Sequence, residues 1–83
     1  MDSFIKKTHK DLSIGDMLIL NDRFYKTTCI ITNKYRRGSR YWYEMHCQNC
    51  FDSKINTYVN HWSVHTINKM IRYNGYRHYP VVN

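Results

Sequence analysis

The alternation of apolar and polar positions predicts four β-strands between residues 12 and 61. Residues 23–35 have the period of a half-buried strand, and the residues on the predicted inner side are Tyr25, Cys29, Ile31 and Tyr35. Residues 54–61 alternate in the same way, and residues 41–47 are rich in aromatic side chains, which favour strands. The apolar run within residues 12–20 fits a strand that is buried on both faces.

Turn-forming residues separate these predicted strands. Asn21 and Asp22 form the first turn, and the glycine within residues 36–40 allows a hairpin between the second and third strands. Residues 48–53 are polar and turn-like, so we expect the third strand to end at Cys47.

A helix and a short extended segment are predicted after residue 61. Ser63 is a suitable N-cap, because its hydroxyl can accept from the free N–H groups of the first helical turn. Apolar residues then recur at helical spacing, at Val64, Ile67, Met70 and Ile71. Gly75 ends the helix, since glycine adopts the left-handed conformation without a Cβ clash. Residues 76–82 form the last strand, with a proline suited to an edge.

The predicted elements make one small domain over residues 12–83, preceded by an N-terminal arm at residues 1–11. The order of four strands, one helix and one strand, together with the opening Leu12-Ser13-Ile14-Gly15-Asp16, resembles the SH3-like small barrels of the KOW and Tudor type. The resemblance implies a mostly β (α+β) fold. Its strands would form a partly open antiparallel barrel, with one short helix before the last strand.

The net charge of the chain points to a negatively charged partner. The 83 residues contain 13 Lys and Arg against 6 Asp and Glu, which leaves +7 at neutral pH. Residues 23–43 contain cations and no acid, and the same holds for all residues after Asp52. A field of one sign attracts polyanions, and Lys or Arg beside phosphate releases condensed counterions. Nucleic acid, DNA or RNA, is therefore the first partner to consider.

Two stretches combine arginines with aromatic side chains. Arginine binds phosphate through its planar guanidinium, and aromatic rings stack on unpaired bases. Residues 35–43 contain both kinds of side chain, and residues 72–79 repeat the combination. The predicted nucleic-acid-binding residues are Lys34, Arg36, Arg37, Arg40, Tyr41, Trp42, Arg72 and Arg77.

An acidic host protein is the alternative partner, because Tyr, Trp and Arg also dominate the hot spots of protein interfaces. The domain would then act as an inhibitor or adaptor. The composition, rich in Asn, Lys, Tyr and Met and poor in Pro, Gly and Ala, resembles that of small early proteins of large bacteriophages. This resemblance implies host takeover or anti-defence activity in the host cytoplasm. The sequence contains no run of 18 apolar residues, so we expect a soluble cytoplasmic protein and no membrane partner.

The cysteines and histidines raise the question of zinc. Cys47 and Cys50 have two residues between them, and His61 and His65 follow with three residues between them. Four such ligands can bind zinc in a tetrahedron. The alternative is that they are ordinary structural and surface residues, because ten residues separate Cys50 from His61 where zinc fingers have about twelve. We expect no cofactor. The odd count of three cysteines also argues against a disulfide framework.

The sequence offers no recognisable catalytic motif. The six acids are scattered, and neither a glycine-rich phosphate loop nor a nucleophile elbow occurs. A chain of this length forms one small core and has little room for a large cleft. We therefore predict a non-catalytic binding module rather than an enzyme.

Overall fold

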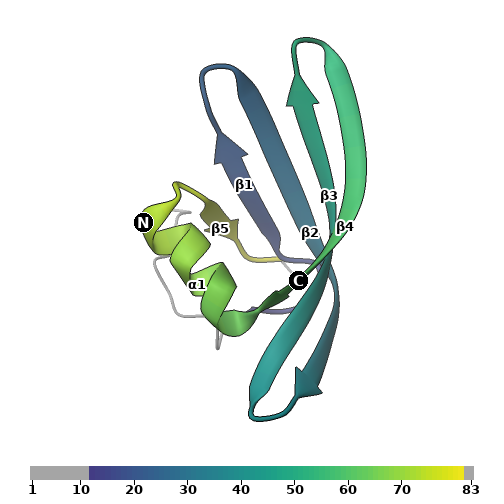
Figure 1. Ribbon diagram of the computed structural model, residues 1–83, viewed down its shortest axis with the longest axis vertical. Helices are drawn as coiled ribbons and strands as arrows, with labels where there is room; N and C mark the ends of the chain where they lie inside the picture. Colours follow the sequence, from purple (N-terminus) through teal and green to yellow (C-terminus); the bar gives the residue numbers. More distant parts are fainter. Residues whose placement is uncertain (1–11, 82–83) are drawn as a thin grey trace.

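The computed structural model describes residues 12–81, which form five strands and one helix (Figure 1). The elements are β1 (Met17–Asn21), β2 (Tyr25–Arg37), β3 (Arg40–Phe51), β4 (Lys54–Ser63), α1 (Val64–Tyr73) and β5 (Arg77–Tyr79). The predicted arm at residues 1–11 lies outside the described residues, as does the end of the last extended segment. The predicted order of four strands, one helix and one strand is confirmed.

The strands form one antiparallel sheet in the order β4-β3-β2-β1-β5 (Figure 1). Each pairing is antiparallel, and within the described residues β4 and β5 are the two edges, so the sheet does not close. This confirms a mostly β fold with one short helix before the last strand, and it is compatible with the SH3-like description. No helix in the described part of the chain is long and apolar enough to cross a membrane.

The core lies between one face of the sheet and α1, and we call this face the core face and the opposite one the outer face. Strand residues that alternate along β1, β2 and β3 supply most of it, namely Leu18, Cys29, Ile31, Tyr43, Met45 and Cys47. Ile67 and Ile71 come from α1 and Tyr76 from the segment that follows it. Both helix residues lie on one stripe of the amphipathic helix, which therefore packs along that stripe.

The ends of α1 are those expected from the sequence. The Ser63 side chain accepts a hydrogen bond from the Thr66 N–H at 3.2 Å, which confirms Ser63 as the N-cap. At the other end, the N–H groups of Asn74 and Tyr76 both donate to the Met70 carbonyl. Gly75 lies between them at φ +82°, in the left-handed region that favours glycine.

A β-bulge in β2 corrects the predicted alternation of that strand. Ile31 pairs with Met45, but Asn33 pairs with Glu44, so Thr32 is an extra residue between the two pairs. The Thr32 hydroxyl donates to the Glu44 carbonyl at 3.2 Å. Beyond the bulge every side chain changes face. Tyr35 therefore lies on the outer face, whereas the sequence placed it with Ile31 on the inner side.

The predicted strand at residues 12–20 begins later than expected, because residues 12–16 form a tight turn. Gly15 has φ +100°, and its N–H donates to the Ile31 carbonyl. The buried Asp16 carboxylate holds the turn: it accepts from the Ser13 N–H at 2.9 Å, the Val81 N–H at 2.8 Å and His78 Nε2 at 2.7 Å. The apolar run Met17–Leu20 thus lies within β1, the residues before it form the turn, and Asp16 joins that turn to Val81 and His78 near the other end of the described chain.

The polar segment at residues 48–53 is also mainly strand, because β3 continues to Phe51. Its side chains pair across three strands: Asn49 lies opposite Thr27 on one side and Asn56 on the other. The Asn49 amide donates to the Thr27 hydroxyl at 2.9 Å. Only Asp52 and Ser53 form the turn, and both have positive φ, as a type I′ hairpin turn requires.

Candidate nucleic-acid interface

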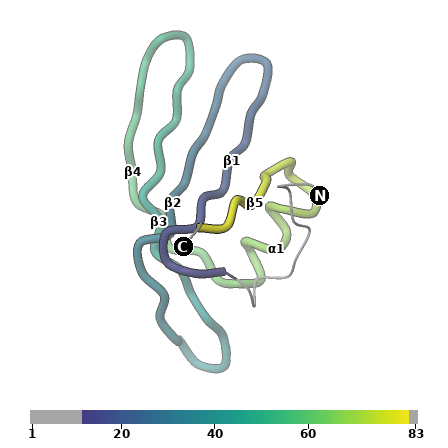
Figure 2. Tube along the Cα trace, turned by 180° about the vertical axis from the view of Figure 1, so that it is seen from behind, coloured from purple at the N-terminus to yellow at the C-terminus, as the bar shows by residue number. Residues whose placement is uncertain are grey.

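The β2–β3 hairpin extends beyond the rest of the sheet, and we call its end, residues 34–42, the basic ribbon. β1 pairs with β2 only at residues 26–30, and β4 pairs with β3 only as far as Trp42. The last residues of the hairpin are therefore a two-stranded ribbon. Figures 1 and 2 show it at the opposite end of the molecule from the β1–β2 and β3–β4 turns.

One face of the basic ribbon carries Lys34 and Arg36 beside Tyr41. Arg36 lies directly opposite Tyr41 in the register, and its guanidinium carbon is 5.7 Å from the centroid of that ring. The Lys34 ammonium is 4.6 Å from the same centroid. Both contacts are within the range of cation–π attraction. They hold the two cations on the core-face side of the ribbon, further toward the hairpin tip than the part of the sheet that α1 covers.

The other face carries Arg37, Arg40 and Trp42. The Arg37 guanidinium is 5.4 Å from the Trp42 ring, which lies on the same face. Arg37 and Arg40 are directly opposite each other across the Gly38-Ser39 turn. Like charges in directly opposite positions destabilise a strand pair. A bound anion between them would remove this repulsion.

No carboxylate among residues 12–81 neutralises these cations. The carboxylates of Glu44 and Asp16 instead contact histidines there, His61 and His78 respectively. The carboxylate of Glu44 is the acid closest along β3 to the basic ribbon, and its oxygens are shared by Thr32 and His61. The basic ribbon therefore presents exposed positive charge that the described part of the fold leaves uncompensated.

The structure does not bring Arg72 and Arg77 to the basic ribbon. Arg72 lies in the last turn of α1, and Arg77 begins β5, opposite Ile19 of β1. Ile19 in turn pairs with Thr28 of β2, so Arg77 lies at the level of Thr28 in the sheet. Arg36 is eight residues further along β2, which is a distance of about 25 Å. Figures 1 and 2 both show the end of α1 far from the hairpin tip. Six of the eight predicted residues therefore lie in the basic ribbon, and the other two, Arg72 and Arg77, lie elsewhere in the fold.

Sequence reasoning missed a small polar group on the outer face beside the basic ribbon. The Tyr35 hydroxyl and His61 Nδ1 are 3.0 Å apart, and His61 Nε2 is 3.8 Å from Glu44. The bulge creates this group, because it turns Tyr35 toward His61 of β4. A signal was present in the sequence: unbroken alternation would have placed Asn33, a polar residue, in the core.

The structure does not bring together the four residues considered as zinc ligands, Cys47, Cys50, His61 and His65. Cys47 is buried on the core face, whereas Cys50, three residues later on the same strand, points to the outer face. His61 is on the outer face but pairs near the other end of β3, opposite Glu44, and His65 is exposed on α1. No cluster of three or more metal-binding side chains occurs within the described residues.

Cys47 instead belongs to a buried thiol pair with Cys29. The two residues lie directly opposite each other on β2 and β3, and neither is in a disulfide. The hydrogen bond to Cys47, together with burial, raises the pKa of the Cys29 thiol. A thiol with a raised pKa is a poor nucleophile, so Cys29 fits a structural role in the core.

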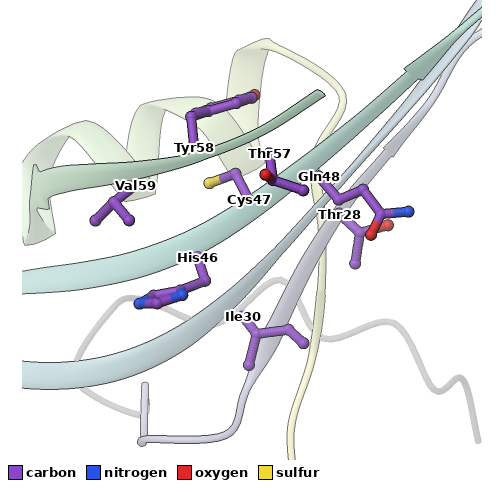
Figure 3. Close-up of a pocket in the computed structure, with 8 residues that line it drawn as sticks. All are labelled: Thr28, Ile30, His46, Cys47, Gln48, Thr57, Tyr58 and Val59. Atoms are coloured by element: carbon purple, nitrogen blue, oxygen red, sulfur yellow. The ribbon is translucent and has the colours of Figure 1, made fainter. Parts of the chain in front are cut away.

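The outer face of the sheet is hollowed between β2, β3 and β4 (Figure 3). The hollow has a volume of about 480 Å³ and is lined on the outer face by Thr28, Ile30, His46, Gln48, Thr57 and Val59. Its lining also includes Cys47 and Tyr58, a register pair on the core-face side. Ile30, His46 and Val59 are directly paired across the three strands and project from the same side of the sheet. Ile30 is 42% and Val59 48% exposed, so this surface is apolar as well as open.

Comparison with known proteins adds no assignment: the chain matches no protein-family model, no curated protein and no solved structure.

Proposed function

We propose that this protein is a non-catalytic nucleic-acid-binding module that uses the basic ribbon. Its four cations, Lys34, Arg36, Arg37 and Arg40, would contact backbone phosphates, because guanidinium and ammonium groups form charge-assisted hydrogen bonds to phosphate oxygens. Tyr41 and Trp42 would support these cations.

One observation carries the proposal: the Arg37–Arg40 pair. The fold places two arginines at directly opposite register positions at a hairpin tip, with no carboxylate of residues 12–81 in an ion pair with either of them. A surface that serves only solubility gains nothing from this arrangement, since scattered charges do the same without the repulsion. A surface that binds phosphate gains two adjacent donors.

Fluorescence anisotropy with short labelled DNA and RNA tests this function. Arg36→Ala combined with Arg37→Ala should weaken binding by about tenfold or more at moderate salt, because two phosphate contacts are lost. The matched control, Lys54→Ala with Lys69→Ala, removes the same charge from the start of β4 and from α1. It should bind nearly as well as the parent protein. Equal losses in both variants, or no binding by the parent protein, would contradict the proposal.

A protein partner is the second candidate, and the hollow on the outer face favours it. Exposed Ile30 and Val59 flank His46 there, and the neighbouring β4 is an edge strand of ten residues. A free strand edge beside an apolar surface can pair with an added strand. This surface is distinct from the basic ribbon, so the two candidates can be separated by mutation.

A pull-down after nuclease treatment, at low and high salt, tests the second candidate. A partner that binds the hollow should be retained at high salt, because apolar contacts are not screened. Val59→Lys should abolish its recovery, and Arg36→Ala with Arg37→Ala should not. Recovery that depends on the arginines and disappears in high salt would rule out the hollow as the docking surface.

A further inference from the structure

We infer that the ligand of the basic ribbon is double-stranded DNA, and that the ribbon enters the major groove so that its two faces meet the two phosphate walls. The inference rests on the proposed function and specifies its ligand. Four features of the described residues support it. They are the distribution of cations over the two faces, the contacts of the aromatic rings with these cations, the dimensions of the hairpin, and the absence of other described elements over its end.

The cations lie on both faces of the basic ribbon. Lys34 and Arg36 are on the core-face side with Tyr41, whereas Arg37 and Arg40 are on the outer side with Trp42. A single nucleic-acid strand that ran along one face would leave the cations of the other face unused. A groove offers phosphates on two sides, which matches this distribution.

The aromatic rings are already in contact with cations. Lys34 and Arg36 both lie over the Tyr41 ring, and Arg37 lies over the Trp42 ring. Binding of single strands depends on bases that stack on such rings. A base would have to displace a cation from its ring here, and would lose a phosphate contact in doing so. The rings therefore position cations rather than offer stacking platforms.

The dimensions of the ribbon fit the groove. The major groove of B-form DNA admits a two-stranded β-ribbon and is about 12 Å wide and 8.5 Å deep. From Arg36 to the turn at Gly38 the two-stranded part of the hairpin advances about 7 Å, at about 3.3 Å per residue. β1 pairs with β2 only at residues 26–30, and β4 pairs with β3 only as far as Trp42, so residues 36–41 are the part of the hairpin that neither strand keeps from entering. The turn itself is open, because a Cβ at Gly38 would have no neighbour within 4 Å.

RNA duplexes do not offer an equivalent site. The major groove of A-form RNA is deep and too narrow for protein elements to enter, and its minor groove is wide but shallow, so a ribbon would lie on it rather than between two phosphate walls. Duplex DNA is therefore the form of nucleic acid that can contact both faces of the ribbon at once.

Binding of the full chain to three labelled ligands of one sequence tests this inference. The ligands are a DNA duplex of about 20 base pairs, its single strand and the corresponding RNA duplex, each measured between about 50 and 200 mM NaCl. We expect the DNA duplex to bind at least about tenfold more tightly than the other two. With four phosphate contacts, the slope of log K against log salt should be about −3.6.

Two further experiments test whether the protein binds the major groove of the DNA and whether both faces of the basic ribbon contact phosphates. Methyl green, which occupies the major groove, should compete with the protein, and netropsin, a minor-groove ligand, should not. Lys34→Ala and Arg37→Ala remove one cation from each face, and each should reduce the magnitude of the salt slope by about 0.9. Thermal unfolding of each variant confirms that the fold is retained.

The outcomes distinguish this inference from the function on which it rests. Equal or tighter binding to single-stranded DNA or to the RNA duplex would overturn groove entry and leave nucleic-acid binding intact. Competition by netropsin alone would overturn the major-groove assignment. A salt slope that changes for only one of the two variants would show that one face is used. Absence of binding to all three ligands would overturn the proposed function as well.

Discussion

At the scale of single residues, the buried Asp16–His78 pair determines how the two ends of the described chain meet. The two side chains are each about 1% exposed, and they are separated by 62 positions in the sequence. The carboxylate also accepts from the Ser13 and Val81 N–H groups, so both of its oxygens are occupied. Buried polar groups of this kind stabilise a fold only while all partners are present.

Asp16→Ala should therefore destabilise the protein strongly. It leaves three buried or partly buried donors without their acceptor, and each such group costs about 1–3 kcal/mol, so the sum is a large share of the stability of a small domain. Asp16→Asn keeps the shape and one acceptor, and should lie between Asp16→Ala and the parent protein. Urea unfolding followed by circular dichroism measures the difference. If Asp16→Ala unfolds at the same urea concentration as the parent protein, the pair contributes nothing to stability.

Tyr76 should make the stability fall at alkaline pH. Burial raises the pKa of its phenol from about 10 in the unfolded chain to about 12. Between these two values the native state keeps a proton that the unfolded state has lost, so the contribution is complete below pH 10 and disappears as the pH approaches 12. Tyr76→Phe should flatten the decline of the urea midpoint over this window. Tyr73→Phe, at an exposed position, is the control and should keep the parent profile.

At the scale of elements, the hairpin tip should show a conflict between stability and binding. Arg40→Glu converts the Arg37–Arg40 pair into an opposite-charge pair, which should raise the free energy of unfolding by about 0.5 kcal/mol. The same change should weaken DNA binding, because it removes one phosphate contact and introduces repulsion. Lys69→Glu on α1 makes the same change in net charge as the control. An Arg40→Glu protein that is less stable than the parent would show that the arginines do not repel each other in the free protein.

The elements also show what sequence reasoning can and cannot predict. Ser63 and Gly75 marked the limits of α1 because caps are local, and the strand order follows from short turns between neighbours. The bulge at Thr32 was missed, because a register shift depends on which residue of the partner strand lies opposite. That one residue decides which cations share a face of the basic ribbon.

At the scale of the whole molecule, the sequence predicted the basic hairpin between β2 and β3 but not its separation from Arg72 and Arg77. Their segment, residues 72–79, combines arginines with aromatic residues as the hairpin does. However, β5 pairs with β1 at a position in the sheet that is far from the hairpin tip. Long-range pairing sets this distance, and no local pattern contains it. Local spacing was also insufficient for Cys47 and Cys50. Their spacing is compatible with zinc binding, but β3 includes both residues and places them on opposite faces of the sheet.

Salt should have opposite effects on the stability of the free protein and on its affinity for DNA. The chain carries +7, and the cations of the basic ribbon have no carboxylate partners among residues 12–81. Salt screens the repulsion among the positive charges of the folded protein, so Tm should rise by roughly 2 °C between about 50 and 200 mM NaCl. Over the same range, loss of counterion release should weaken DNA binding by about a hundredfold for four contacts. Thermal unfolding and anisotropy in matched buffers measure both. A Tm that falls with salt would mean that internal ion pairs already neutralise the cations, and the basic ribbon would then have no uncompensated charge to offer to phosphate.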